Sequence, residues 1–202
     1  MDEPLPRPDL TDAAWIKIVT RLDPQVLLDF CYNLERLYRL NPYLSIEYWM
    51  MPARNLIKAK WRNSSTPAEF TLESEIQVTY RQNEIRLCYC SGLKKETSLI
   101  IEPHEQGSSL TVIDDYSSRA DRKDSSNLPE QVDRSLQAWG AALKSFLFHY
   151  NYLRKIPGIE CVIDRFWVRL SPMARRITYL LVVITVFELV LLLVFTGVLL
   201  LK

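Results

Sequence analysis

The sequence predicts an α+β protein in which an antiparallel sheet precedes one long helix, with a single transmembrane helix at the C-terminal end. Three patterns predict it. Short segments rich in β-branched and aromatic residues follow one another from residue 43 to residue 118, separated by turn-like residues. Apolar residues then recur every three or four positions from Val132 to Leu153, the spacing of an amphipathic helix. Finally, the run from Ile177 to Leu201 is apolar and carries Glu188 as its only charge.

Composition and charge exclude some classes of function. The chain has 202 residues and a formal net charge of +1. Its length fits one domain with an appendage, and the near-neutral balance argues against a nucleic acid partner, which normally requires a basic face. Residues 1–12 form an acidic, proline-rich N-terminal leader without the basic and apolar regions of a signal peptide. We therefore expect the globular part to stay on the cytoplasmic side.

A strand and two short helices are predicted ahead of the main run of strands. Residues 13–22 alternate in polarity, as a half-buried strand does. Asp23 and Pro24 are typical of a helix N-cap and of the first helical position. The helical spacing that follows is broken near Asn33 and ends at Asn41-Pro42, which indicates two helices rather than one.

Six strand segments follow without a helical pattern between them, which predicts an antiparallel meander. They are YLSIEYWMM (43–51), LIKAKWR (56–62), FTLESEIQVTYR (70–81), EIRLCYCSGL (84–93), ETSLIIEP (96–103) and SSLTVIDDYSS (108–118). A polar linker, residues 119–127, ends them. Asn127 and Glu130 then form a capping-box pattern at the start of the long helix, which should end near Pro157-Gly158.

A short amphipathic helix is predicted between the long helix and the apolar run, over residues 157–173. Its apolar side chains fall on one face, and its charged side chains lie largely off that face. A helix with a tryptophan and arginines beside a span is typical of the bilayer interface, and the alternative is a helix packed on the domain. The residues predicted at the membrane interface are Phe166, Trp167, Arg165, Arg169, Arg175 and Arg176.

The transmembrane helix is predicted over residues 174–202. The run from Ile177 to Leu201 has 25 residues, roughly 37 Å of helix at about 1.5 Å per residue, which is enough to cross a hydrocarbon core of about 30 Å. Arg175 and Arg176 precede the run and only Lys202 follows it, so the positive-inside rule places the domain on the cytoplasmic side. This is the layout of a single-pass, tail-anchored membrane protein.

Glu188 is costly near the middle of a bilayer, so its presence requires an explanation. On a helix that turns by about 100° per residue, Thr185 lies about 60° from Glu188. Thr178 and Thr196 lie about 80° from Glu188 on the same side. A polar stripe on an apolar helix is typical of a helix–helix interface. We therefore predict contact with another integral membrane protein, with self-association and a plain anchor as the alternatives.

The order of elements resembles that of the START-like superfamily, also called SRPBCC, which includes Bet v 1-like and polyketide cyclase-like proteins and has the helix-grip fold. Three stretches carry the resemblance: LERLYRLNPYLSIEYW after the first helix, IIEPHEQGSSLTVIDDY as paired strands with a glycine-containing turn, and SLQAWGAALKSFL as the C-terminal helix. It covers about residues 13–155, which implies a START-like domain over residues 13–156. The transmembrane tail departs from most members.

The resemblance implies a curved sheet that wraps around the long helix and leaves an apolar cavity for a hydrophobic molecule such as a lipid or a quinone. Aromatic and apolar side chains of the sheet and the helix would line it. The expected ligand-binding residues are Trp49, Trp61, Tyr80, Tyr89, Tyr116, Trp139, Leu143 and Phe146. Simple core packing is the alternative for each of them.

No pattern in the sequence establishes a catalytic residue or a cofactor. Glu102 and His104 are two residues apart, but the proline between them and the turn that follows indicate a strand end in solvent. Asp114 and Asp115 are adjacent on a strand, so only one of them could face a cavity. His149 lies on the long helix among aromatic residues, where we expect it to be partly buried.

The cysteines do not predict a metal site. Cys88 and Cys90 share one face of a predicted strand, but no second pair or nearby histidine completes a set of ligands. In a reducing compartment we expect all four cysteines of the chain to be thiols.

The patterns predict a membrane-anchored subunit or assembly partner of an integral membrane complex, and the resemblance implies a START-like domain that binds a lipid or quinone. One alternative is a cyclase- or hydrolase-like enzyme with a hydrophobic substrate, which would rest on family analogy alone. The other is a START-like scaffold whose cavity is filled by its own aromatic side chains.

Overall fold

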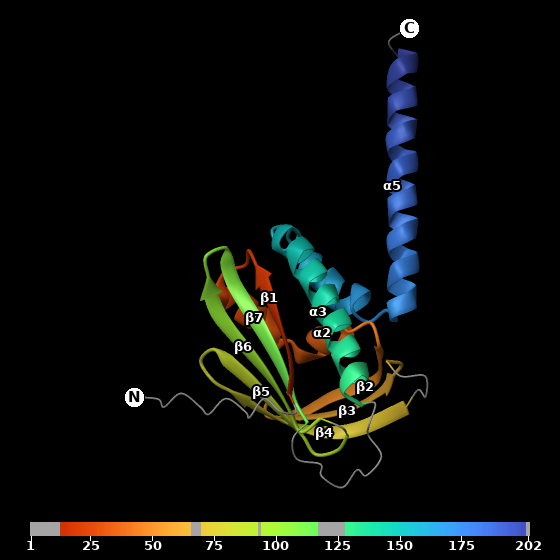
Figure 1. The fold of residues 1–202 in the computed structure, drawn as a ribbon. Coiled ribbons are helices and arrows are strands. Elements are labelled where there is room, and N and C mark those ends of the chain that lie inside the picture. Colours follow the sequence, from red (N-terminus) through yellow and green to blue (C-terminus); the bar gives the residue numbers. More distant parts are fainter. Residues whose placement is uncertain (1–12, 66–69, 93, 117–127, 201–202) are drawn as a thin grey trace.

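The computed structural model describes residues 13–65, 70–92, 94–116 and 128–200. The predicted leader, the polar linker with Asn127 of the capping box, and Lys202 lie outside these residues. Figure 1 shows a domain of one sheet and several helices, from which the helix α5 (Pro172–Leu200) projects as a long rod.

Seven antiparallel strands form one sheet in the order β1-β7-β6-β5-β4-β3-β2. From β2 to β7 the neighbours in sequence are also neighbours in the sheet, so the predicted meander is confirmed, and β1 pairs with β7 at one edge. The strands are β1 (Ala13–Thr20), β2 (Leu44–Ala53), β3 (Leu56–Asn63), β4 (Phe70–Tyr80), β5 (Glu84–Tyr89), β6 (Glu96–His104) and β7 (Gly107–Asp115). In β3, β5 and β6 every second side chain is buried, because one face of the sheet packs on the helices.

Two short helices, α1 (Pro24–Tyr32) and α2 (Leu34–Arg39), connect β1 to β2. The carboxylate of Asp23 accepts a hydrogen bond from the main-chain N–H of Gln25 at 2.9 Å and so caps α1. Asn33 ends α1, and its side chain accepts a bond from the N–H of Arg36 at 3.1 Å and caps α2. The predicted break near Asn33 is therefore confirmed.

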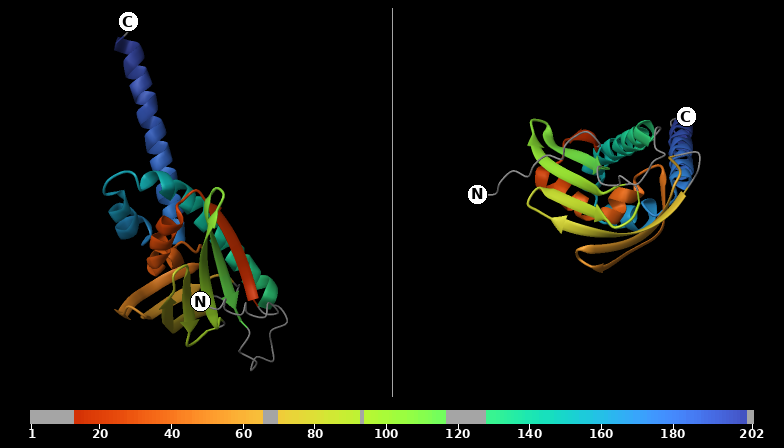
Figure 2. Two further views of the ribbon diagram at one scale, coloured as in Figure 1. Left: turned by 90° about the vertical axis from the view of Figure 1, so that its left-hand side faces the viewer. Right: turned by 60° about the horizontal axis from the view of Figure 1, so that its bottom comes forward.

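The long helix α3 (Leu128–Leu153) lies across the concave face of the sheet, which curves around it and around α1 and α2 (Figure 2, right). At Gly140 of α3, an added Cβ would lie 2.1 Å from Cδ1 of Ile16 in β1. Any other residue at position 140 would therefore have to displace the end of the Ile16 side chain. Leu143 and Leu147 follow on the buried face of the helix.

The segment between α3 and α5 differs from the single amphipathic helix that the sequence predicts. It forms one turn of α-helix, α4 (Ile159–Val162), and then a π-helical turn, η2 (Ile163–Trp167). The wider turn changes the angular spacing of side chains, so Ile163 and Val168 enter the core whereas Phe166 is exposed. Some apolar side chains of the predicted face thus pack in the domain core, and others are exposed to solvent.

Arg36 in α2 joins the segment between α3 and α5 to the rest of the domain through an ion pair and hydrogen bonds. Its side chain is only 7 % exposed, and its Nη1 lies 3.2 Å from Oδ1 of Asp164 in η2. Nη2 donates to the main-chain oxygen of Phe30 at 3.1 Å, and the guanidinium lies 4.3 Å from the centroid of the Phe30 ring. Asn33 donates to the other oxygen of Asp164 at 3.3 Å. One buried cation therefore connects α1, α2 and η2.

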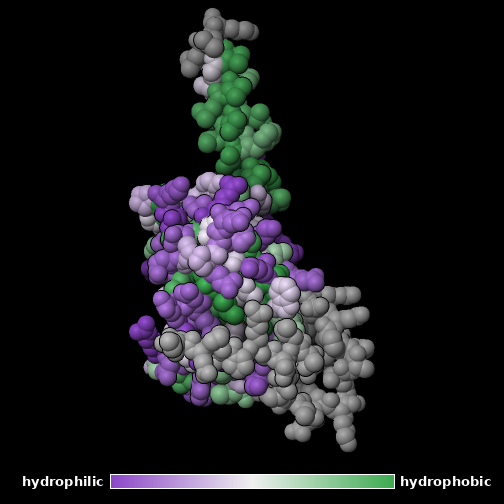
Figure 3. Space-filling model, turned by 60° about the vertical axis from the view of Figure 1, so that its left-hand side comes forward, coloured by the Kyte–Doolittle hydropathy of each residue, from purple (hydrophilic) through white to green (hydrophobic). Residues whose placement is uncertain are grey.

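Helix α5 is long and apolar enough to cross a membrane by length and composition. The candidate span, Met173–Val198, has a mean hydropathy of 2.7 and is not buried by the rest of the protein. Figure 3 shows the helix as an apolar column above a largely polar domain surface. The side chain of Arg175, in its first turn, donates to the main-chain oxygen of Arg39 at 2.5 Å and joins the helix to α2.

Replacing Asp164 should destabilise the domain, because Asp164→Ala leaves the buried guanidinium of Arg36 without its carboxylate. We expect a loss of about 2 kcal/mol in the free energy of unfolding. Urea unfolding of the full chain in mild detergent, followed by tryptophan fluorescence, measures it. Arg165→Ala, at the exposed neighbouring residue, should change the unfolding free energy by less than about 0.5 kcal/mol. Equal losses in the two variants would contradict this role of Arg36.

Candidate functional site

A chain of polar side chains crosses the concave face of the sheet. The hydroxyl of Tyr38 in α2 is hydrogen-bonded to that of Tyr89 in β5. Tyr89 is in turn 3.0 Å from the hydroxyl of Thr97 in β6, which donates to Oδ1 of Asp114 in β7 at 2.5 Å. Lys94 binds the other oxygen of Asp114. Four secondary-structure elements and one loop thus contribute to a single hydrogen-bonded series, which we call the interior polar chain.

The pleat of the sheet places these side chains together. Thr97 and Asp114 are direct partners in the β6–β7 register, and Tyr89 extends β5 toward the same end. All three occupy inward positions of their strands, since alternate residues point to opposite faces. Tyr38, Tyr89, Thr97 and Asp114 are buried, whereas the side chain of Lys94 is 30 % exposed. The chain therefore runs from the interior to a cation at the surface.

Two tryptophans flank the inner end of the chain. The ring centroid of Tyr38 lies 5.6 Å from that of Trp49 and 5.4 Å from that of Trp139. The indole N–H of Trp139 donates to the main-chain oxygen of Leu37 at 3.1 Å. The indole nitrogen of Trp49 is buried and has no hydrogen-bond partner among the residues that the structure describes. Trp49 therefore holds an unsatisfied donor beside the interior polar chain.

A bulge brings Trp49 to this position. The β2–β3 register shifts between Ile46 and Tyr48, so one extra residue is inserted in β2. Ile46 and Trp49, three residues apart, both pack against the core as a result. A regular strand would place residues at this spacing on opposite faces.

Burial keeps the two phenols protonated. Desolvation raises the pKa of Tyr38 above its ordinary value, and the nearby carboxylate of Asp114 raises it further, against the lowering effect of the hydrogen bond with Tyr89. Desolvation likewise raises the pKa of Tyr89, and Tyr38 and Asp114 add to the rise. Both side chains are therefore neutral hydroxyls that can donate or accept a hydrogen bond.

The carboxylate of Asp114 is fully engaged. It accepts from Thr97, pairs with Lys94, and lies 3.5 Å from the hydroxyl of Tyr116. Of the adjacent pair of aspartates, Asp114 faces the interior and Asp115 turns outward to Lys95 at 3.8 Å, so the prediction that only one reaches the inner face is confirmed. A carboxylate whose oxygens already have these partners is better suited to orienting hydrogen bonds to a ligand than to abstracting a proton from it.

The residues predicted to bind a ligand do not all meet at one place. Trp49, Tyr89 and Trp139 lie together at the interior polar chain, and Tyr116 lies at its outer end. Trp61 and Leu143 are buried core residues.

The other two predicted residues lie in separate aromatic contacts. Phe146 packs on Phe30 and Tyr150, with ring centroids 5.8 and 5.9 Å away. Tyr80 packs on Tyr32 at 5.5 Å. The sequence prediction did not include Tyr38, Lys94 or Thr97, although the inward position of Thr97 follows from strand alternation.

The weaker candidates for chemistry lie at the surface. Glu102 pairs with Lys17 at 3.6 Å, and both side chains are exposed. His104 accepts a bond from the N–H of Gln106 in the exposed turn after β6, as the prediction of a strand end in solvent implies. His149 is exposed, so the expected partial burial is wrong.

The cysteines and acidic residues form no site in the part of the chain that the structure covers. No disulfide joins the four cysteines there. Burial raises the pKa of Cys31 to about 12, so its thiol stays protonated. Within the same residues, no group of three His, Cys, Asp or Glu side chains could hold a metal ion.

The predicted interface residues lie around the start of α5. Phe166, Arg165, Arg169 and Arg176 are exposed or nearly so, whereas Trp167 and Arg175 are half-buried and Trp167 packs against the core.

The predicted stripe on α5, Thr178, Thr185, Glu188 and Thr196, lies on a helix that no other described element of the domain covers. The hydroxyl of Thr196 donates to the main-chain oxygen of Leu192 at 2.8 Å. This bond within the helix satisfies Thr196.

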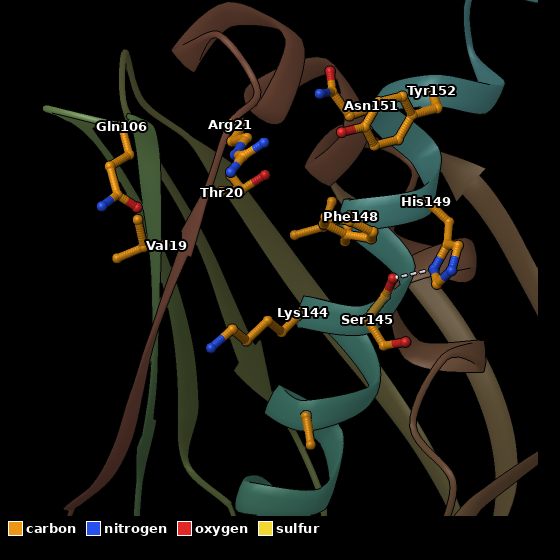
Figure 4. A pocket seen from close by; sticks show the side chains of 12 residues that line it. Val19, Thr20, Arg21, Gln106, Lys144, Ser145, Phe148, His149, Asn151 and Tyr152 are labelled. Carbon is orange, nitrogen blue, oxygen red and sulfur yellow. Dashed lines mark hydrogen bonds between the residues drawn. The ribbon is translucent and has the colours of Figure 1, made fainter.

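A groove of about 480 Å³ lies between the end of β1 and the last turns of α3 (Figure 4). Its volume is within the range of small-molecule pockets. Phe148, Tyr152 and Leu147 give it apolar walls, and Arg21 and Lys144 add two cations. None of the predicted ligand-binding residues lines this groove, so it is a second candidate site, separate from the interior polar chain.

The two buried phenols predict a loss of stability at high pH. Their pKa values are raised on folding, so the folded state binds their protons more tightly than the unfolded state. Their contribution is complete below the ordinary tyrosine pKa of about 10 and is lost as the pH rises above it. The unfolding free energy of the wild type should therefore fall more steeply above pH ~10 than that of a Tyr38→Phe/Tyr89→Phe variant. Tyr152→Phe, at an exposed position, should keep the wild-type slope; an unchanged slope in the double variant would contradict the assignment.

Among solved structures, the domain is similar to the di-domain ARO/CYC StfQ from the steffimycin biosynthetic pathway, with a TM-score of 0.50 and 10% identity over 71% of this chain and 51% of StfQ. The chain thus spans about half the length of StfQ. A protein from Rhodobacter sphaeroides gives a TM-score of 0.48 at 14% identity, covering 70% of this chain and 95% of its own. A protein from Thermus thermophilus gives 0.46 at 15% identity, covering 67% and 95%.

No family model and no curated protein sequence matches the chain. The fold is supported by the strand order, by the sheet that curves around α3, and by the similarity to StfQ. The domain therefore has the START-like helix-grip fold, as the order of elements in the sequence predicts.

Proposed function

We propose that this protein is a membrane-anchored helix-grip protein that binds a hydrophobic molecule bearing a hydrogen-bond acceptor, such as a quinone or a lipid. The proposed site lies between the sheet and α3, beside the interior polar chain. The observation that carries the proposal is the indole N–H of Trp49, which is buried next to the ring of Tyr38 without an acceptor among the described residues.

An unsatisfied buried donor is unfavourable, since it loses its bond to water and gains nothing in return, at a cost of about 1–3 kcal/mol. A carbonyl or ester oxygen of a bound molecule would supply the missing acceptor. The rings of Tyr38, Trp49 and Trp139 would contact the apolar part of the same molecule. The hydroxyls of the polar chain offer further donors and acceptors, so the site combines apolar walls with a few directed polar groups, as ligand sites do.

Helix α5 supports the second part of the proposal. Its length and composition suit a membrane span, and an anchor would hold the domain beside the phase in which a water-insoluble molecule dissolves. The stripe of Glu188, Thr178 and Thr185 supports docking against a helix of an integral membrane protein, because polar groups in lipid require partners. On this basis the protein is a subunit or assembly partner of a membrane complex.

Trp49→Phe tests the interior site, because it keeps the aromatic ring and removes only the N–H. We expect the affinity for the co-purified molecule, identified by native mass spectrometry of the full chain, to fall about tenfold. A short-chain ubiquinone analogue serves as the probe if a quinone is found, and a phospholipid of the identified class serves otherwise. Fluorescence quenching measures the affinity.

Two control variants separate the alternatives. Trp15→Phe, at a residue 61% exposed in β1, should bind like the wild type. Phe148→Ala, in the groove between β1 and α3, should also bind like the wild type. Loss of binding in Phe148→Ala together with normal binding in Trp49→Phe would move the ligand to that groove and refute the interior site. A purified protein without any bound hydrophobic molecule would favour the scaffold alternative.

Glu188→Leu tests the membrane partner. If Glu188 forms a hydrogen bond to another transmembrane helix, the substitution should shift most of the protein from a complex of native size to the monomer in mild detergent, as measured by mass photometry. Val190→Leu, on a different face of α5, should leave the complex intact. An unchanged complex in Glu188→Leu would refute the proposed interface.

A further inference from the structure

A second cavity lies where the domain meets α5. It has a volume of about 80 Å³, and its walls come from the end of α2, the start of β2 and the segment that leads into α5. Three arginines, Arg39, Arg169 and Arg175, line it together with Ser171, and no acidic residue does. The cavity, which we call the arginine pocket, therefore favours an anion.

The charges of the arginine pocket are largely uncompensated. Glu35 pairs with Arg39 at 2.8 Å from outside the lining. For Arg169 and Arg175, no carboxylate of the residues placed by the structure lies within ion-pair distance. Among those residues the buried Nε of Arg175 has no hydrogen-bond partner, while its Nη2 is bound to the main-chain oxygen of Arg39. The pocket is therefore positively charged, and one of the arginines that line it keeps an unused donor.

The N-terminus of α5 adds to the positive electrostatic potential of the arginine pocket. The hydroxyl of Ser171 accepts from the N–H of Ala174 at 3.2 Å and caps the helix, and Ser171 itself lines the pocket. The N-terminal end of a long helix carries partial positive charge. The oxygens of a phosphate can accept several charge-assisted hydrogen bonds at once. Planar guanidinium groups and the N–H groups at a helix N-terminus are suitable donors for these bonds.

The size of the pocket limits what can enter. A volume of about 80 Å³ accommodates a small polyatomic group but not an acyl chain. The candidate span begins at Met173, two residues after Ser171, so the pocket lies beside the end of the apolar helix. If α5 crosses a bilayer, this is where the phosphates of phospholipids are found. A lipid could thus place its phosphate in the pocket and leave its chains alongside α5.

We infer that the arginine pocket binds a phosphate group. The site is independent of the proposed interior ligand, because it shares no residue with the interior polar chain. Its role is to fix the domain relative to α5, since one phosphate would contact α2, the residues after η2 and the first turn of α5 together.

The experiment uses the full chain in mild detergent, with phosphatidic acid as the probe and diacylglycerol as the comparator that lacks the phosphate. Native mass spectrometry counts the lipid bound during a titration. The wild type should bind phosphatidic acid about tenfold more tightly than diacylglycerol, because both lipids carry the ester oxygens that the interior site would accept and only one carries the phosphate. Arg169→Gln/Arg175→Gln should lower the affinity for phosphatidic acid about tenfold, because it removes two charged donors.

Arg165→Gln is the matched control. It removes the same charge from an exposed residue of the same segment that does not line the pocket, and it should retain nearly wild-type affinity. Arg169→Gln alone, at an exposed residue, should weaken binding to a lesser degree, which keeps the test valid if the double variant unfolds. Equal losses in Arg165→Gln and Arg169→Gln would show attraction by net charge only and would overturn the proposal.

A second arm identifies the source of the phosphate. Inorganic phosphate is titrated against bound phosphatidic acid. Displacement at similar concentrations supports a pocket for free phosphate, and retention of the lipid supports a phospholipid headgroup. Failure of both probes to bind the wild type would overturn the inference, without bearing on ligand binding at Trp49.

Discussion

The placement of one buried cation, Arg36, determines how the parts of this protein hold together. A guanidinium with little access to water must find partners for its charge and its N–H groups. Nη1 and Nη2 of Arg36 find them in the carboxylate of Asp164 and the main-chain oxygen of Phe30, and the guanidinium lies over the Phe30 ring, while the buried Nε has no partner among the described residues. These partners come from α1 and from the segment that leads to α5, whereas Arg36 itself lies in α2. Satisfying the charge therefore requires that the domain and the segment at the base of α5 fold together.

The same requirement shapes the interior. Polar side chains on the inner face of the sheet are tolerated because each finds a partner, from Tyr38 through Tyr89 and Thr97 to Asp114 and Lys94. The indole N–H of Trp49 is an exception beside this chain, because it has no hydrogen-bond partner among the described residues; buried atoms of Arg36, Ser109 and Arg175 lack one as well. A protein selected only for stability would gain by replacing such a donor. The exception is consistent with a site that is completed by a bound molecule.

Much of the architecture could be predicted from the sequence, because it depends on local patterns. Alternation and turn residues identified the strands, and Asp23, Pro24 and Asn33 marked the helix ends. In regular strands the face of a residue followed too, as the opposite orientations of Asp114 and Asp115 show. Partnerships between distant elements could not be predicted. The bond between Tyr38 and Tyr89 depends on how α2 crosses the sheet, and the inward position of Trp49 depends on a bulge that alternation does not reveal. The π-helical turn likewise altered which residues of the segment between α3 and α5 face the core.

The short connection between the domain and α5 has a consequence for encounters within a membrane. Val168 is buried, and Arg175 is bound to Arg39, so no long flexible linker separates the folded core from the first turn of the rod. A domain on a flexible tether samples many orientations and loses that freedom when it docks. Here most of that orientational entropy is already lost on folding. If α5 crosses a bilayer, a partner in that bilayer would meet one face of the domain in a nearly constant pose, and the encounter would require only lateral diffusion and rotation about the membrane normal.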